Sequence, residues 1–157
     1  GFQNTFHIVK LRLSAYFNYS LGGKIYNLSE LWMSGSSMTN QYRYMLDGWH
    51  AQRNPNSDIP RAGTAQNMLP SSFLVHDASY LRLQNVMVSY TLDVRKWTKV
   101  FRYATLSLNA YNVFLLTKYN GFDPDVSTNS SDSALRRVAI NDYPKARQFT
   151  ATLQVTF

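Results

Sequence analysis

The residue types that most often carry catalysis occur in this chain without the spacing that catalysis requires. Its three histidines, His7, His50 and His76, lie far apart and form no His-Glu-x-x-His metal motif. The chain has no cysteine, which excludes a disulfide framework and a thiolate metal site. It contains neither a Gly-x-Ser-x-Gly nucleophile elbow nor a glycine-rich phosphate loop. We therefore predict that the protein is not an enzyme and has no catalytic residues, no metal site and no cofactor.

Three aspartates, Asp123, Asp125 and Asp132, lie in a segment rich in serine and asparagine. Calcium takes several oxygen ligands, and loops of this kind can supply them. The EF-hand spacing is absent, however, and Asp123 precedes a proline, which is typical of a turn. We predict a turn here rather than a metal site.

Three aromatic residues, Trp32, Tyr42 and Trp49, could stack on a sugar ring, because a flat aromatic face offers apolar area at little cost in entropy. The alternative is that they pack this segment on itself or against a partner protein. A short helix is predicted between Asn40, as its N-cap, and Gly48, as its end. The residues that would share its apolar face are Tyr42, Met45, Leu46 and Trp49.

The last nine residues carry the clearest pattern in the chain. Side chains alternate across a strand, so the apolar residues of this segment fall on one face and threonine and glutamine on the other. The apolar residues are Phe149, Ala151, Leu153, Val155 and Phe157. The closing strand of an outer-membrane β-barrel has this pattern and ends in an aromatic residue. A half-buried strand of a soluble sandwich shares the alternation and is the alternative.

Three further segments alternate in a similar way, and each is long enough for the ~9–11 residues of a tilted membrane strand. The four predicted strands span residues 7–21, 79–92, 103–114 and 146–157. Before residue 84 the alternation weakens, because Tyr80, Arg82 and Gln84 would fall on the apolar face. We expect that half of the strand to rise above the bilayer.

The composition agrees with strands in a membrane. Charged residues make up 16% of the chain, below the roughly 25% of soluble domains, and aromatic residues make up 15%. No apolar run approaches the ~18 residues that a membrane helix needs. The net charge of +7 could indicate nucleic acid, but the basic residues are scattered over turns, strand ends and loops. We predict contacts with solvent and lipid headgroups, and no nucleic-acid partner.

The connections between the predicted strands are unequal. Residues 23–78 and 115–145 form long loops, whereas residues 93–102 form a short turn. If the strands run up and down, both long loops are extracellular and the turn is periplasmic, as in outer-membrane barrels. Four strands cannot close a barrel, since the smallest single-chain barrels have eight. We predict an all-β fold of four antiparallel transmembrane strands, completed by a longer chain or by further copies.

Several motifs in a fixed order carry a resemblance to a known family. They are Ser20–Tyr26, Ile59–Arg61, Asp77–Val86, Asn112–Val126 and Tyr143–Thr150. Together they resemble the C-terminal end of SusC/RagA-type TonB-dependent outer-membrane transporters, over nearly the whole chain. The long loop departs from that family in one place. Family members often have Trp-Thr-Pro before the Pro-Arg pair, and here Trp49 is followed by His50 and Ala51.

The resemblance implies a 22-stranded barrel with an internal plug, of which this chain is the C-terminal part. Such proteins import large nutrients, typically glycans, oligosaccharides or peptides, with a SusD-like surface lipoprotein as a lid. TonB supplies energy through a segment that would lie upstream of this chain. The protein would then lie in the outer membrane of a Gram-negative cell as a multi-pass β-barrel. The alternative is a barrel that serves only as a scaffold in an envelope complex.

Two further sets of residues receive roles from the resemblance. The first resembles the signal that the barrel-assembly machinery reads, and alternatively only packs toward lipid: Leu153, Val155 and Phe157. The second would line the lumen of the barrel, or pair there with carboxylates of the plug: Lys10, Arg12 and Tyr16. The aromatic residues of the long loop would contact the ligand or the lid.

Overall fold

The computed structural model describes residues 1–35, 40–64, 69–125, 137–140 and 143–157. The chain divides into two compact units, which are described separately. The sheet unit comprises Gly1–Leu21, Ser79–Lys118 and Pro144–Phe157. The loop unit comprises Gly22–Ala78 and Tyr119–Tyr143, and so is inserted into the sheet unit at two points of the sequence.

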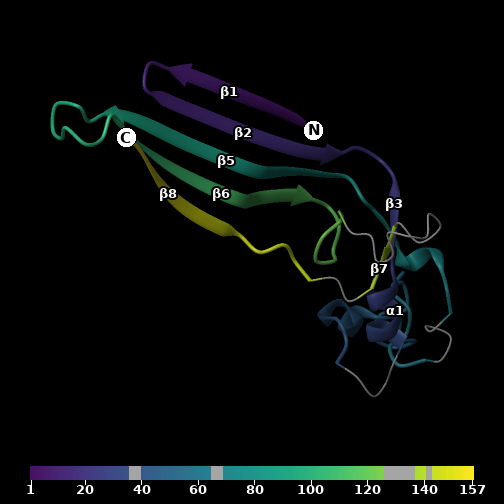
Figure 1. Ribbon diagram of the computed structural model, residues 1–157. Coiled ribbons are helices and arrows are strands. Elements are labelled where there is room, and N and C mark those ends of the chain that lie inside the picture. Colours follow the sequence, from purple (N-terminus) through teal and green to yellow (C-terminus); the bar gives the residue numbers. More distant parts are fainter. Residues whose placement is uncertain (36–39, 65–68, 126–136, 141–142) are drawn as a thin grey trace. The chain divides into compact units, whose positions relative to one another are not determined.

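The sheet unit is a single antiparallel sheet of five strands (Figure 1). In the order in which they pair, the strands are β1 (Phe2–Ile8), β2 (Leu11–Ser20), β5 (Tyr80–Asp93), β6 (Tyr103–Thr117) and β8 (Gln148–Thr156). Neighbouring strands within the sheet are also neighbours along the sequence of this unit, which is the up-and-down arrangement of a barrel wall. The sheet is open, because β1 and β8 each pair on one side only.

The prediction of one strand over residues 7–21 is wrong in one respect, because the chain reverses direction within this range. Ile8 pairs with Leu11, and Val9 and Lys10 form the two-residue turn of a β1–β2 hairpin. The φ angle of Val9 is 52°, a left-handed conformation that β-branched residues rarely adopt. The turn contains neither glycine nor asparagine, so the alternation of apolar residues reads straight through it. The sheet therefore has five strands rather than four.

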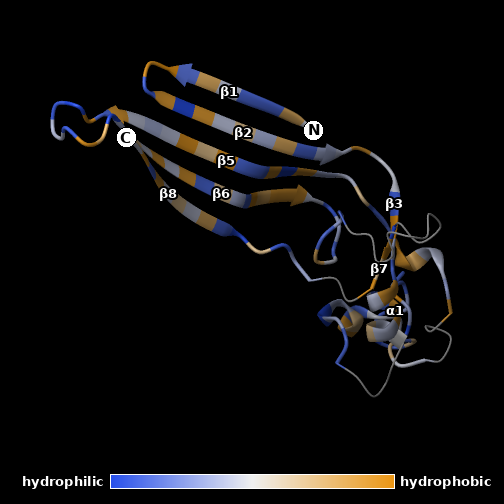
Figure 2. Cartoon of the chain, viewed as in Figure 1, coloured by the Kyte–Doolittle hydropathy of each residue, from blue (hydrophilic) through white to orange (hydrophobic). Residues whose placement is uncertain are grey.

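The two faces of the sheet differ in chemistry along its whole width. Residues directly opposite each other on paired strands share a face. One such row is apolar from β2 to β8 and runs through Leu13, Val88, Leu108 and Ala151. The opposite face is polar, and Figure 2 shows the two kinds of residue as alternating bands along the strands. The alternation expected from the sequence is thus continuous across neighbouring strands.

Hydroxyl groups bond to one another across the polar face. The Ser107 Oγ donates to the Ser89 Oγ at 3.0 Å, and the hydroxyls of Thr91 and Thr105 lie 3.0 Å apart. These pairs satisfy each other without charge. They suit a wall that has to be polar but closely packed, because small hydroxyl groups can both donate and accept.

The sequence predicted that the apolar face of the second strand weakens before residue 84. A β-bulge in β5 changes this, because it alters the face on which those residues lie. The register shifts at Gln84 on β5, and β6 accommodates the shift at Asn112, whose φ angle is 52°. An extra residue in a strand moves every following side chain to the opposite face. Leu83 therefore joins the apolar face, where it pairs with both Phe17 and Phe114.

The same bulge moves Tyr80 and Arg82 to the polar face. Asn18 lies on that face of β2, and its side-chain amide donates to the Tyr80 hydroxyl at 3.3 Å. Both Tyr80 and Arg82 are buried. The apolar face consequently continues past residue 84 instead of ending there, and the sequence pattern could not show this because a bulge has no fixed signature.

The loop unit has a small core of its own. Its three-stranded sheet pairs β4 (Val75–Asp77) with β3 (Lys24–Asn27), and β3 with β7 (Val138–Ala139). The helix α1 (Leu28–Gly35) follows β3 directly, and the described residues of the unit also form the 3-10 helices η1 (Arg43–Asp47) and η3 (Ser72–Leu74). The core is formed by Ile25, Ala78, Tyr119 and Ala139. Within the described residues, none of the helices has the length and apolar character needed to cross a membrane.

Candidate functional site

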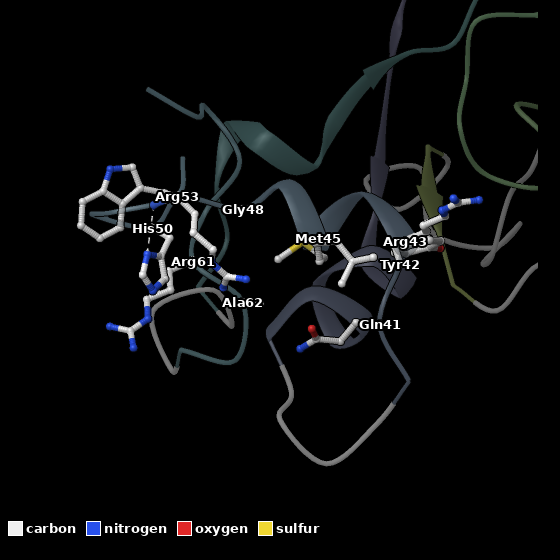
Figure 3. Close-up of a pocket in the computed structure, with 11 residues that line it drawn as sticks. Gln41, Tyr42, Arg43, Met45, Gly48, His50, Arg53, Arg61 and Ala62 are labelled. Atoms are coloured by element: carbon white, nitrogen blue, oxygen red, sulfur yellow. Dashed lines mark hydrogen bonds between the residues drawn. The ribbon is translucent and has the colours of Figure 1, made fainter. Parts of the chain in front are cut away.

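A pocket of about 530 Å³ lies in the loop unit (Figure 3). Its walls come from η1, from the loop that follows η1 and from residues 61 and 62. The four residues predicted to share an apolar helix face, Tyr42, Met45, Leu46 and Trp49, all line it. The spacing of these residues was therefore informative about which side chains lie on one surface.

The element that carries them differs in detail from the prediction. It is a 3-10 helix over Arg43–Asp47, and its N-cap is Tyr42, in an extended conformation and without a side-chain capping hydrogen bond. Asn40 therefore does not cap it. Gly48 follows its end, as expected, and the Gly48 amide donates to the Met45 carbonyl at 3.1 Å. A five-residue helix is too short for an α-helical pattern, and the 3-10 form is common in such short pieces.

Trp49 is held in place by one hydrogen bond of its indole and one of its backbone. Its Nε1 donates to the Pro55 carbonyl at 3.0 Å, and its backbone amide donates to the Ile59 carbonyl at 2.8 Å. The side chain nevertheless remains exposed. An exposed aromatic ring in a fixed orientation presents a face on which a ligand can stack.

A tight turn follows Trp49 and orients His50. The backbone groups of His50 and Asn54 bond to each other in both directions, at 3.3 and 3.0 Å. The His50 Nδ1 accepts from the backbone amides of Gln52 and Arg53, at 3.2 and 3.4 Å. Because Nδ1 is an acceptor, the neutral ring carries its proton on Nε2 and keeps a donor there.

A close approach of two segments brings Arg61 to the same pocket. A Cβ atom on Gly48 would lie only 2.7 Å from the Pro60 carbonyl oxygen, so this position has no room for a side chain. The Ser57 hydroxyl closes the loop further, since it donates to the Asp47 carbonyl at 2.6 Å and accepts from the Ile59 amide at 3.2 Å. Residues 59–62 are thereby packed against the end of η1.

The charge of the pocket is the feature that sequence reasoning missed. Arg43, Arg53 and Arg61 line it, all three are exposed, and the described lining residues include neither aspartate nor glutamate. Arg61 belongs to the Ile59–Arg61 motif, which had signalled a family resemblance but no role in a site. Arg53 had no signal at all, because only the turn at His50–Asn54 brings it to the lining of the pocket.

A buried network of polar side chains links η1 to the rest of the loop unit. Glu30 is only 4% exposed, and its carboxylate accepts hydrogen bonds from the Tyr44 hydroxyl and from the His76 ring. Its backbone amide donates to the Asn27 side chain at 3.1 Å, which caps α1. Burial and the bond to Glu30 raise the pKa of Tyr44 well above its usual value. Glu30 thus joins α1, η1 and β4.

The remaining predicted residues lie elsewhere. Trp32 is exposed on α1 and is absent from the lining of the pocket, so only two of the three aromatic residues are brought together. Lys10 lies in the β1–β2 turn, where its carbonyl accepts from the Thr91 amide at 2.9 Å. Arg12 and Tyr16 lie on the polar face of β2. Arg12 and Lys10 line a second hollow of about 540 Å³, and Tyr16 does not.

The terminal residues lie on the apolar face of β8. Leu153 pairs with Leu106 and Val155 with Ala104, and both are exposed. Phe157 is exposed as well, and its ring centroid lies 5.1 Å from that of Phe101. The arrangement leaves the three side chains accessible, and their role in barrel assembly stays a prediction.

The aspartate-rich segment has the geometry of a turn where it is described. The Asp123 Oδ1 accepts from the Asp125 amide at 2.9 Å, which is the geometry of an Asx-turn. Asp132 lies outside the described residues. Among the residues that the structure describes, no three acidic, histidine or cysteine side chains are grouped as metal ligands.

An antiparallel sheet with one apolar and one polar face, whose apolar side chains are exposed, has the surface that the wall of a membrane β-barrel presents to lipid. The comparisons with known proteins make this class more specific. The TonB-dependent receptor P26 of Formosa agariphila is 33% identical over 166 residues, which cover 100% of this chain and 16% of that protein. The TonB-dependent receptor SusC of Bacteroides thetaiotaomicron is 27% identical over 115 residues, 69% of this chain and 10% of that protein.

Comparison with solved structures indicates the same family. The RagAB peptide importer in its closed-closed state aligns with a TM-score of 0.75 and 29% identity, over 94% of this chain and 16% of that one. No protein-family model matches the chain. The chain belongs to the SusC/RagA-like family of TonB-dependent transporters. It spans about one sixth of the length of the first relatives, which are receptors and importers by name.

Proposed function

We propose that this chain is the C-terminal part of an outer-membrane importer of large nutrients, such as glycans, oligosaccharides or peptides. The observation that carries the proposal is the two-faced sheet, because a wall that is apolar on one side and polar on the other fits a channel through lipid. The similarity to SusC and to the RagAB peptide importer supports the same function. Catalysis has no support from the chemistry of the described residues.

We infer the surroundings of the chain from the same arrangement. The apolar face would contact outer-membrane lipid, and the polar face, with Arg12 and Tyr16, would face the lumen. The segments on either side of the loop unit leave the sheet at one end, since Ser20, Tyr80 and Thr117 pair in register there. That end would be extracellular, and the turn at residues 93–102 would be periplasmic.

The proposed partners follow from this placement. A SusD-like surface lipoprotein would cover the extracellular side as a lid and would meet the loop unit. TonB would act through segments outside this chain. The barrel-assembly machinery would read Leu153, Val155 and Phe157 before the sheet is incorporated. None of these partners requires a cofactor in this part of the protein.

Uptake of labelled nutrients by cells that express the full-length protein tests the proposal. Labelled oligosaccharides and labelled peptides are offered in parallel to cells with the protein, cells without it and cells without TonB. An importer takes up at least one class, and uptake stops when either the protein or TonB is removed. A scaffold would leave uptake unchanged in all three strains, and its removal would instead disperse an envelope complex.

A denaturing gel of native outer membrane tests the placement separately. A heat-modifiable band near ~100 kDa is expected, the size of a many-stranded barrel with its plug. A band near 18 kDa after boiling would instead identify a separate subunit of the size of this chain.

A further inference from the structure

The pocket of the loop unit combines an indole with a cluster of cations. Arg53 and Arg61 enter it from two chain segments that the bond between the Trp49 amide and the Ile59 carbonyl joins. A guanidinium group stays protonated at any pH that a cell meets, so the charge of the pocket is permanent. The nearby carboxylates of Asp47 and Asp58 are exposed and are absent from the lining.

The cations are not spread evenly around the pocket. Figure 3 shows His50, Arg53 and Arg61 gathered at one side and Arg43 at the opposite side. Trp49 is adjacent in sequence to His50 and lines the same pocket. A ligand on the indole would therefore meet two guanidinium groups and the Nε2 donor of His50 together.

Trp49 and His50 are held in place before any ligand arrives. The Trp49 Nε1 is bound to the Pro55 carbonyl, and the His50 Nδ1 is bound to the amides of Gln52 and Arg53. Groups that are already held in place lose less entropy on binding, which raises affinity. A surface loop that served only as a solvated connection would not need this arrangement.

We propose that this pocket binds an acidic sugar unit of the imported molecule, and the proposal rests on the nutrient-import function above. The apolar face of the sugar ring stacks on Trp49, and its carboxylate or sulfate lies between Arg53 and Arg61. Guanidinium groups bind such planar or tetrahedral oxyanions through paired hydrogen bonds. His50 supplies a further donor from Nε2.

A saccharide fits these groups better than a peptide for a geometric reason. One acidic sugar carries a ring face and an oxyanion on the same rigid unit, and the lining of the pocket combines the Trp49 indole with the guanidinium groups of Arg53 and Arg61. In a peptide the ring and the carboxylate belong to different flexible side chains, and ordering both costs more entropy. An acidic peptide is therefore treated as a competing outcome of the test.

The test measures binding to the full-length protein in detergent by calorimetry. The probes are an oligogalacturonate and a neutral oligogalactose of the same length. We expect the charged probe to bind at least about tenfold more tightly, and Arg53→Gln and Arg61→Gln each to weaken it about tenfold, which is typical for loss of a charged hydrogen bond. Trp49→Ala should weaken binding of both probes. Added salt should weaken only the charged probe.

Lys99→Gln provides the matched control, because it removes one exposed charge from the 93–102 turn of the sheet unit. It should leave binding unchanged, and surface labelling should show equal amounts of every variant. If Arg53→Gln lowers the amount at the surface, Arg53→Lys keeps the charge without the guanidinium fork and should still weaken binding. Equal affinity for the charged and neutral probes overturns the proposal, and so does an equal effect of Lys99→Gln.

An acidic hexapeptide that binds more tightly than the oligogalacturonate overturns the saccharide assignment. Nutrient uptake is measured on the same variants. Uptake that persists in wild-type cells without any preference for charge contradicts only the acidic-sugar proposal. Binding of the charged probe without TonB-dependent uptake of any nutrient contradicts the importer function instead.

Discussion

The sheet unit exposes large apolar residues along one face, whereas the loop unit buries some of its apolar residues in a core. On the sheet, Leu108 is 50% exposed and Leu153 is 68% exposed. In the loop unit, Ile25 and Leu74 are each 1% exposed. The same residue types thus lie on the outside of one unit and on the inside of the other. The difference is explained if the first unit meets lipid and the second meets water.

In that case, different interactions stabilise the two units. In the loop unit, burial of apolar surface contributes as it does in any soluble domain. If the sheet lies in lipid, its large apolar side chains gain little from one another, and the backbone hydrogen bonds between strands are its main stabilising contacts, because lipid cannot satisfy a free backbone group. The stability of the sheet should then depend more on whether a side chain on the apolar face is polar than on the shape of that side chain.

The two units also differ in how they satisfy their buried or partly buried polar groups. The polar face of the sheet uses pairs of small hydroxyl groups, such as Ser89 with Ser107, that are partly buried and uncharged. The loop unit buries a carboxylate, Glu30, and satisfies it with Tyr44 and His76. A buried acceptor with several donors specifies one arrangement of the elements that supply them.

The largest expected effect separates the two faces of one strand. Ala151→Arg places a charge on the apolar face of β8, and Thr152→Arg places the same charge on the polar face, one residue away. If the apolar face meets lipid, Ala151→Arg destabilises the folded barrel by about 2–4 kcal/mol and Thr152→Arg by much less. Urea titration of the full-length protein in lipid vesicles measures both. Equal destabilisation would break the comparison, since both faces would then meet a polar medium.

The next effect concerns the loop unit alone. Glu30→Ala leaves Tyr44 and His76 without their buried acceptor, which should destabilise the loop unit by about 1–3 kcal/mol. Hydrogen exchange should accelerate at the amides of Met45 and Tyr26, while the amides of β6 keep their protection. Asp47→Ala, at an exposed carboxylate, is the control and should change little. Faster exchange along β6 would mean that the two units do not unfold separately.

The smallest effect tests whether the terminal aromatic residue does more than pack. Deletion of Phe157 should lower insertion into the outer membrane severalfold, and Thr156→Ala should not. Phe101→Ala removes the ring that contacts Phe157 and leaves the terminal residue present. If the assembly machinery reads Phe157, Phe101→Ala inserts almost normally. Equal losses in the deletion and in Phe101→Ala would reduce the role of Phe157 to packing.

The sequence predicted the sheet well wherever the alternation of apolar and polar residues was uninterrupted. The alternation in residues 149–157 and 103–110 predicted two faces, and both faces are present. The β1–β2 turn was missed because Val9 and Lys10 are not turn-forming residues. The bulge at Gln84 was missed because one inserted residue resembles a mere weakening of the pattern.

The candidate site was predicted only in part, for a related reason. The spacing of Tyr42, Met45 and Trp49 indicated a shared surface, and these residues do line one pocket. Arg53 and Arg61 could not be added from spacing, because a turn and a backbone bond between Trp49 and Ile59 bring them there. Trp32 resembled the other aromatic residues in the sequence, but α1 places it outside the lining.

By itself, the sequence determined which residues share a face within an uninterrupted stretch of strand, because side-chain alternation is a local property of a strand. It also determined the family, through motifs whose order survives at 33% identity. Only the tertiary structure decided the strand count, the face on which Arg82 lies and the cationic character of the pocket around Trp49. Those features depend on register and on contacts between distant segments, and the free energies that select them arise only when the chain has folded.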